Sequence, residues 1–184
     1  MKINLVDVDP EMVEAWREEF SSLDDVSIHQ GSIVDLANCT VVSPANSYGY
    51  MDGGVDAVYR RHFGKQIEKK VKGKISKRSD RILPVGAAIV VTTRNERVPF
   101  MIVAPTMEMP EAVPADNAYR AFRAVLRVAK QNEEHITELY CPGMATGVGQ
   151  VDPRDSAKAM RQALEDHRSE QVASHNSGGC ARSV

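Results

Sequence analysis

The chain has 184 residues, of which 42% are hydrophobic and 26% are charged, and its formal net charge at pH 7 is −2. This length suits one well-buried domain rather than two, and the composition is that of an ordinary globular protein. The near-neutral charge excludes a global electrostatic attraction to nucleic acid or to a membrane surface, and the sequence has no run of about 18 apolar residues that could span a bilayer.

Two strands and a helix are predicted at the start of the chain. Residues 2–8 and 26–29 are short, largely apolar runs typical of strands. Between them, Asp9 and Pro10 form an N-cap followed by proline at the first helical position. Apolar residues at helical spacing then predict a helix over about 10–20. Trp16 lies on the apolar stripe of that helix, so we assign it to the core.

A strand, a loop and a helix follow one another between residues 41 and 64. The strand over residues 40–43 is nearly all apolar, as expected of a strand that is buried on both faces of a sheet. The helix begins after Gly53 and Gly54, and glycines at this point let the backbone approach a ligand closely. The free N–H groups of the first helical turn, at the positive end of the helix dipole, make an anion site.

Residues 141–153 repeat this design, with a strand, a Gly-rich turn and a helix that starts at Asp152 and Pro153. The backbone amides of residues 146–149 can close over a phosphate in a nest-like curve. Loops that follow the strands of an open α/β sheet meet at one crevice, so the two loops predict a ligand with two linked phosphates. The motifs GxxxxGK[ST] and GxGxxG are absent, which argues against a P-loop ATPase and a Rossmann dinucleotide site.

Eight basic side chains fall within residues 65–81. Ile67, Val71 and Ile75 are spaced by four, which predicts an amphipathic helix that is interrupted near Gly73. The basic run can be a nucleic-acid patch or a solvated helix face. No aromatic residues are interleaved to stack on bases, and this favours the solvated face.

The rest of the chain continues the alternation of strands and helices. The predicted elements are two strands that pair antiparallel, a helix, a strand and a last helix, over residues 87–93, 98–104, 117–131, 136–141 and 153–167. Residues 168–184 lack periodicity, and we predict that they form a disordered C-terminal tail. Residues 1–167 then make one α/β/α domain with a mixed sheet.

The three cysteines, Cys39, Cys141 and Cys180, have neither CxxC spacing nor an even number. This pattern fits a reducing compartment and indicates no metal site. The N-terminus also lacks the apolar core of a signal peptide. We therefore expect a cytoplasmic protein that holds no metal ion and no cofactor.

Four short motifs follow one another along the chain: Gly31-Ser32-Ile33, Ser43-Pro44-Ala45-Asn46, Gly53-Gly54-Val55-Asp56 and Ala145-Thr146-Gly147-Val148-Gly149. In this order and spacing they resemble the macro domain family, and the resemblance covers roughly residues 1–167. It implies a three-layer α/β/α macro-domain-like fold with a mixed central sheet. It also implies binding of ADP-ribose and, as in some members, hydrolysis of ADP-ribose esters.

The resemblance assigns roles to individual residues. It implies two catalytic residues, Asp56 and Asn46, of which Asn46 lies by the distal ribose and Asp56 orients or activates a water. It implies ligand contacts from Ser32, Ile33, Asn46, Gly53, Gly54, Val55, Ala145, Thr146, Gly147, Val148 and Gly149. Each assignment has a structural alternative. Asp56 can be a first-turn acid that favours the helix dipole, Asn46 an Asx-turn residue, and the glycines plain turn residues.

Three positions depart from the family pattern. Ser32 stands where many members have an aspartate that accepts a hydrogen bond from adenine. Asp52 places a carboxylate beside the predicted diphosphate, where it would weaken binding unless it points to solvent. Arg60 stands where the family often has histidine. These departures indicate a divergent branch of the family.

Three functions therefore stay open. The chain can be a hydrolase that removes ADP-ribose or an acyl group from it, a reader that binds ADP-ribose or a related nucleotide without turnover, or a structural or assembly protein with the basic helix of residues 65–81 as its interaction face. The expected partners are the nucleotide itself and ADP-ribosylated protein. Neither a membrane nor nucleic acid is expected as a partner.

Overall fold

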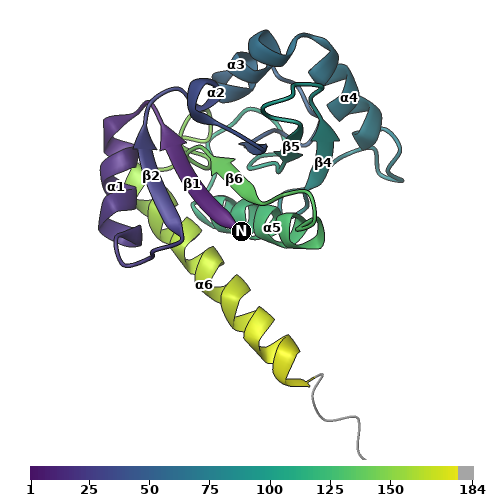
Figure 1. Cartoon of the computed structure of the whole chain (residues 1–184). Coiled ribbons are helices and arrows are strands. Elements are labelled where there is room, and N and C mark those ends of the chain that lie inside the picture. Colours follow the sequence, from purple (N-terminus) through teal and green to yellow (C-terminus); the bar gives the residue numbers. More distant parts are fainter. Residues whose placement is uncertain (178–184) are drawn as a thin grey trace, which may run out of the picture.

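The computed structural model describes the backbone of residues 1–177 and the side chains of residues 1–173 (Figure 1). Its centre is a sheet of six strands, β1 (Lys2–Asp7), β2 (Val26–Gln30), β3 (Thr40–Ser43), β4 (Ile89–Thr92), β5 (Phe100–Val103) and β6 (Glu138–Cys141). The strand order is β2-β1-β6-β3-β5-β4. All neighbours are parallel except β4, which runs antiparallel to β5. The predicted mixed sheet is therefore confirmed.

Helices cover both faces of this sheet. They are α1 (Pro10–Phe20), α2 (Ile33–Leu36), α3 (Gly54–Phe63), α4 (Gln66–Ile75), α5 (Asp116–Gln131) and α6 (Pro153–Ser177). One face packs on α1, α5 and α6, where Trp16, Phe122 and Leu164 belong to one buried cluster. The other face packs on α3 and α4, where Tyr59 and Ile67 belong to a second cluster. The three-layer α/β/α arrangement predicted from the sequence is confirmed (Figure 1).

Local sequence patterns explain where several elements begin. Asp9 accepts a hydrogen bond from the Glu11 amide at 2.9 Å, and Pro10 is the first residue of α1, as the cap pattern predicts. Asp152 caps α6 in the same way, through the Arg154 amide at 2.9 Å. The single-turn helix α2 was not predicted, because four residues are too short for helical periodicity to be recognised.

The C-terminal helix is longer than predicted. The prediction of a disordered tail is wrong for residues 168–177, because α6 continues to Ser177 and extends beyond the body of the domain (Figure 1). The part of the helix around residues 168–170 is held by ion pairs to the rest of the domain, from Arg168 to Asp25 at 2.6 Å and from Arg123 to Glu170. Such ion pairs leave no apolar stripe in the sequence, so helical periodicity does not indicate this part of the helix. Residues 178–184, with Cys180, lie outside the described residues.

The basic helix α4 partly serves the fold. Gly73 lies inside this helix, so the predicted interruption there is wrong. Lys70 Nζ donates to the carbonyl of Thr92 at 2.7 Å, and Lys74 Nζ donates to the carbonyl of Val90. Both carbonyls belong to the edge strand β4, so the lysines of α4 occupy acceptors that this edge would otherwise offer to another chain.

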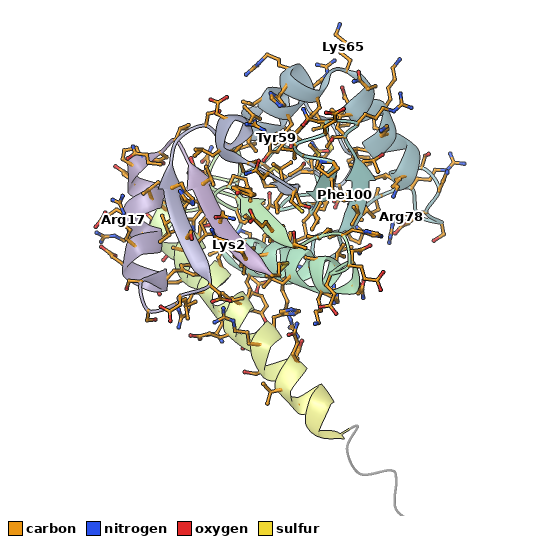
Figure 2. All side chains as sticks on the ribbon, viewed as in Figure 1. Lys2, Arg17, Tyr59, Lys65, Arg78 and Phe100 are labelled. Carbon is orange, nitrogen blue, oxygen red and sulfur yellow. The ribbon has the colours of Figure 1, made fainter. Side chains whose placement is uncertain are left out.

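Other basic groups on this side of the molecule point outward. Figure 2 shows Lys65 and Arg78 at the surface, whereas Tyr59 lies inside. Among residues 1–177, no helix combines the length and apolar character needed to cross a membrane.

Candidate functional site

A cavity of about 460 Å³ lies at the carboxyl ends of the five parallel strands. Each of these strands contributes the residues that follow it, namely residues 7–9 after β1, 31–33 after β2, 44–58 after β3, 106–110 after β5 and 142–149 after β6. Ligands of open α/β sheets bind at this edge, where loops lead from strands into helices. The topology of the sheet therefore gathers the polar loops of the chain around one cavity.

The structure brings all of the predicted site residues to this cavity. They are Ser32, Ile33, Asn46, Gly53, Gly54, Val55, Asp56, Ala145, Thr146, Gly147, Val148 and Gly149. The two Gly-rich loops thus share a single cavity, which is the arrangement that a ligand with two linked phosphates would need.

The first Gly-rich loop presents the start of α3 to the cavity. The first hydrogen bond of the helix runs from the Ala57 amide to the carbonyl of Gly53 at 3.1 Å, and the amides of Gly54, Val55 and Asp56 have no acceptor among the described residues. Gly54 has φ of +53°, and a Cβ on it would meet no atom within 4 Å. Three unpaired N–H groups at the positive end of a ten-residue helix favour an anion.

The second Gly-rich loop is closed by its own backbone. The amide of Gln150 bonds the carbonyl of Gly147, and the amide of Val151 bonds the carbonyl of Ala145, both at 3.1 Å. Ala145 has φ of +64°, which is uncommon for a residue with a Cβ. The four amides of residues 146–149 donate to no acceptor in the described part of the chain. Successive unpaired amides on a curved backbone form an anion-binding nest.

Asp56 lies at the wall of the cavity with only 6% of its surface exposed. Burial raises the pKa of its carboxyl to about 7; the hydrogen bond from Ser43 opposes this rise, and the charge of Asp52 adds to it. The Ser43 hydroxyl donates to Oδ1 at 2.6 Å and fixes the carboxyl in place. A carboxyl that titrates near neutral pH can both accept and return a proton, which is the property that a general acid–base group needs.

Asn46 uses most of its side chain inside its own loop. Its Oδ1 accepts from the amides of Tyr48 at 3.1 Å and Tyr50 at 3.2 Å, and its Nδ2 donates to the carbonyl of Tyr50 at 2.9 Å. This geometry is the Asx-turn alternative raised from the sequence. One Nδ2 hydrogen stays available toward the cavity, so Asn46 can hold the loop and still donate one hydrogen bond to a ligand.

Sequence reasoning missed several residues of the cavity wall. Asp7 is the last residue of β1, and its carboxylate accepts from the amides of Gly143 at 2.9 Å and Asp9 at 3.1 Å. Its place at the end of a parallel strand was a usable sign. Thr106 is fully buried and its hydroxyl has no hydrogen-bond partner among the described residues. Tyr50 is 44% exposed at the cavity, and no pattern in the sequence marks it or Thr106.

Ser32 and Asp52, two of the residues that depart from the family pattern, line the cavity. Ser32 precedes α2, but its hydroxyl makes no capping hydrogen bond. Asp52 is exposed, so its carboxylate can turn toward solvent and away from an anion in the cavity. In the described part of the chain, no group of three or more His, Cys, Asp or Glu side chains is placed to hold a metal ion.

A family model for the macro domain matches residues 42–160. The chain belongs to the macro domain family. A protein of Aquifex aeolicus is 37% identical to this macro domain over 142 residues, which are 76% of this chain and 81% of that protein.

Solved macrodomain structures have the same fold. The macrodomain of Mycobacterium tuberculosis DarG is similar with a TM-score of 0.64 at 19% identity, over 74% of this chain and 88% of that one. A Trypanosoma brucei macrodomain, solved in complex with ADP-ribose, is similar with a TM-score of 0.58 at 20% identity, over 74% of this chain and 56% of that one.

The part of this macro domain that precedes the matched region also contributes to the cavity. Residues 1–41 form β1, α1, β2 and α2, and they supply Asp7, Ser32 and Ile33 to the cavity wall. Since β1 pairs with both β2 and β6, the loops after these three strands are held side by side.

Proposed function

We propose that this macro domain binds ADP-ribose, or a related nucleotide, with the diphosphate held between its two Gly-rich loops. The observation that carries this proposal is the presence of two separate sets of unpaired backbone amides at one cavity, at residues 54–56 and 146–149. Each set suits one phosphate group. The macrodomain of Trypanosoma brucei named above binds ADP-ribose, and this supports the same ligand here.

Turnover is the second part of the proposal. Asp56 would accept a proton from a water that attacks an ester or glycosidic bond at the distal ribose, so that ADP-ribose is released from an ADP-ribosylated protein or from an acylated form. The carboxyl has the necessary pKa of about 7, and the bond from Ser43 sets its orientation.

A reader without turnover is the second candidate. The side chain of Asn46 is largely committed to its loop, which leaves one N–H for a ligand and favours binding over precise positioning of a reacting group. A structural or assembly protein that uses the basic helix α4 as its interaction face has less support, because Lys70 and Lys74 already bond the edge strand β4 of the same domain.

Calorimetric titration with ADP-ribose tests the binding proposal. Gly147→Glu places a carboxylate in the second loop, where a Cβ meets open space, so the fold should be unchanged. Charge repulsion should then weaken the binding of ADP-ribose by at least about a hundredfold. The matched control is Gly73→Glu, because Gly73 also faces open space but lies in α4 away from the cavity. Equal affinity of the two variants would show that the second loop does not contact the ligand.

Release of ADP-ribose from a mono-ADP-ribosylated protein and from O-acetyl-ADP-ribose tests turnover. We expect Asp56→Ala to lose turnover by at least about a hundredfold while it keeps ADP-ribose binding, because the general base is removed and the amides stay. Unchanged turnover in that variant would exclude Asp56 as the base. Binding by the wild-type protein without any turnover would establish the reader.

A further inference from the structure

Glu68 of α4 joins three parts of the domain through one carboxylate. Lys72 Nζ lies 2.7 Å from its Oε1, and Arg60 Nε of α3 lies 2.8 Å from its Oε2. The contact with Arg60 is an ion pair without an aligned hydrogen bond. The backbone amide of Met51 also faces this carboxylate. Lys72 and these other partners lower the pKa of Glu68, so the group is charged at neutral pH.

This carboxylate is not an ordinary surface group. The Glu68 side chain is only 15% exposed, whereas its partners Lys72 and Arg60 are 40% and 37% exposed. Met51 lies in the loop just before Gly53 and Gly54, and Arg60 lies in the last turn of α3, the helix that those glycines begin. Glu68 therefore fixes the loop and the helix of the first phosphate cradle relative to each other.

Lys72 extends this arrangement to the rim of the cavity. Its ammonium lies 4.1 Å from the centre of the Tyr50 ring, a cation–π contact that restrains the ring. Tyr50 lines the cavity and is half-exposed there. Since Glu68 in turn holds Lys72, the ring depends on the same carboxylate.

Helix α4 also touches the loop directly. A Cβ on Gly49 would lie 2.7 Å from Val71 Cγ1 and 2.9 Å from Ile75 Cδ1, so only glycine allows this close approach. Gly49 has φ of +73°, which also favours glycine. The apolar side chains bring α4 against the loop, and Glu68 supplies the directional contacts.

We propose that Glu68 is a positioning residue of the ligand site: it faces the Met51 amide, and it holds α3 through Arg60 and the Tyr50 ring through Lys72 in the geometry that a ligand needs. The expected effect of Glu68 on affinity rests on the proposed ADP-ribose binding, whereas its expected effect on the Met51 loop is independent of any ligand. The proposal also gives a reason for Arg60, which stands where the family often has histidine: Arg60 is the partner of Glu68 on α3.

Hydrogen exchange and calorimetry on the same variants test this role. In Glu68→Ala, the Met51 amide loses the carboxylate that it faces, so we expect it to exchange at least about tenfold faster and ADP-ribose to bind at least about tenfold more weakly. The amides of Tyr48 and Tyr50 should change less, because Asn46 still accepts from them. Glu68→Gln keeps an acceptor oxygen, and should lie between Glu68→Ala and the wild type in both measurements.

The matched control is Glu165→Ala, which removes another i, i+4 ion pair, from Arg161 on α6, away from the cavity. Equal exchange and affinity in Glu68→Ala and Glu165→Ala would overturn the proposal. Faster exchange at Met51 with unchanged ADP-ribose affinity would also overturn it, because the loop would then not govern binding. If the wild-type protein does not bind ADP-ribose, the proposed function fails, and the exchange of the Met51 amide still decides whether Glu68 holds the loop.

Discussion

The two Gly-rich loops present free amides to the same cavity by different physical means. The first is the N-terminus of a helix whose preceding loop is held by side chains, namely Asn46 within the loop and Glu68 on α4. The second is closed by its own backbone bonds around Ala145 at positive φ, and its ends are bonded by Asp7 at Gly143 and by the Val113 amide at Gly149. The first loop should therefore be sensitive to its side-chain partners, and the second to the residue types that its backbone angles permit.

The largest effect is expected in the second loop. A Cβ on Gly149 would lie 2.5 Å from the carbonyl oxygen of Ala145, so Gly149→Ala must displace the loop. We expect a loss of about 1–3 kcal/mol in the free energy of unfolding, measured by denaturant titration, and a strong loss of ADP-ribose binding. Gly147→Ala is the contrast, because a Cβ there meets open space and should leave the unfolding free energy unchanged. Equal stability of the two variants would contradict the account of a self-closed loop.

An effect of similar size is expected from pH at the first loop. Folded Asp56 keeps its proton to about pH 7, whereas in the unfolded chain it loses the proton near 3.8. Between these values the folded state binds more protons, so its stability falls as pH rises, by about 2–3 kcal/mol from pH 5 to pH 7. Denaturant unfolding at both pH values should show this loss in the wild type and not in Asp56→Asn. The same pH dependence in both proteins would show that Asp56 is not buried in the way described.

The smallest expected effect is a difference between the two loops in how their amide hydrogen exchange responds to salt. The partners of Glu68 are partly exposed, so their charges are screened as ionic strength rises. Between about 0.05 M and about 0.5 M salt, we expect hydrogen exchange at Met51 to speed up by about twofold, while the amides of Gln150 and Val151 stay unchanged. Equal acceleration in both loops would remove the distinction between them.

The sequence allowed much of the fold and the position of the site to be predicted. Helix α1 followed from the Asp9 cap and its apolar spacing, and the antiparallel pair of β4 and β5 from two apolar runs around a turn. The site followed from glycines that occur between a strand and a helix. These features are local, so a single sequence displays them.

The features that could not be predicted depend on contacts between distant parts of the chain. The pKa of Asp56 is set by burial under the surrounding loops, and the role of Glu68 by a loop amide and by Arg60 on another helix. Asp7 reaches the second loop only because β1 lies beside β6. Residues 168–170 of α6 are held by ion pairs to Asp25 and Arg123 rather than by an apolar stripe.

If both sets of amides bind one diphosphate, their chemical shifts, measured by NMR during titration with ADP-ribose, must respond together. We expect the amides of residues 54–56 and of residues 146–149 to shift with one dissociation constant, and adenosine, which has no phosphates, to leave both sets unmoved. Shifts confined to one loop, or shifts of both loops with adenosine alone, would contradict the binding of one diphosphate by both sets.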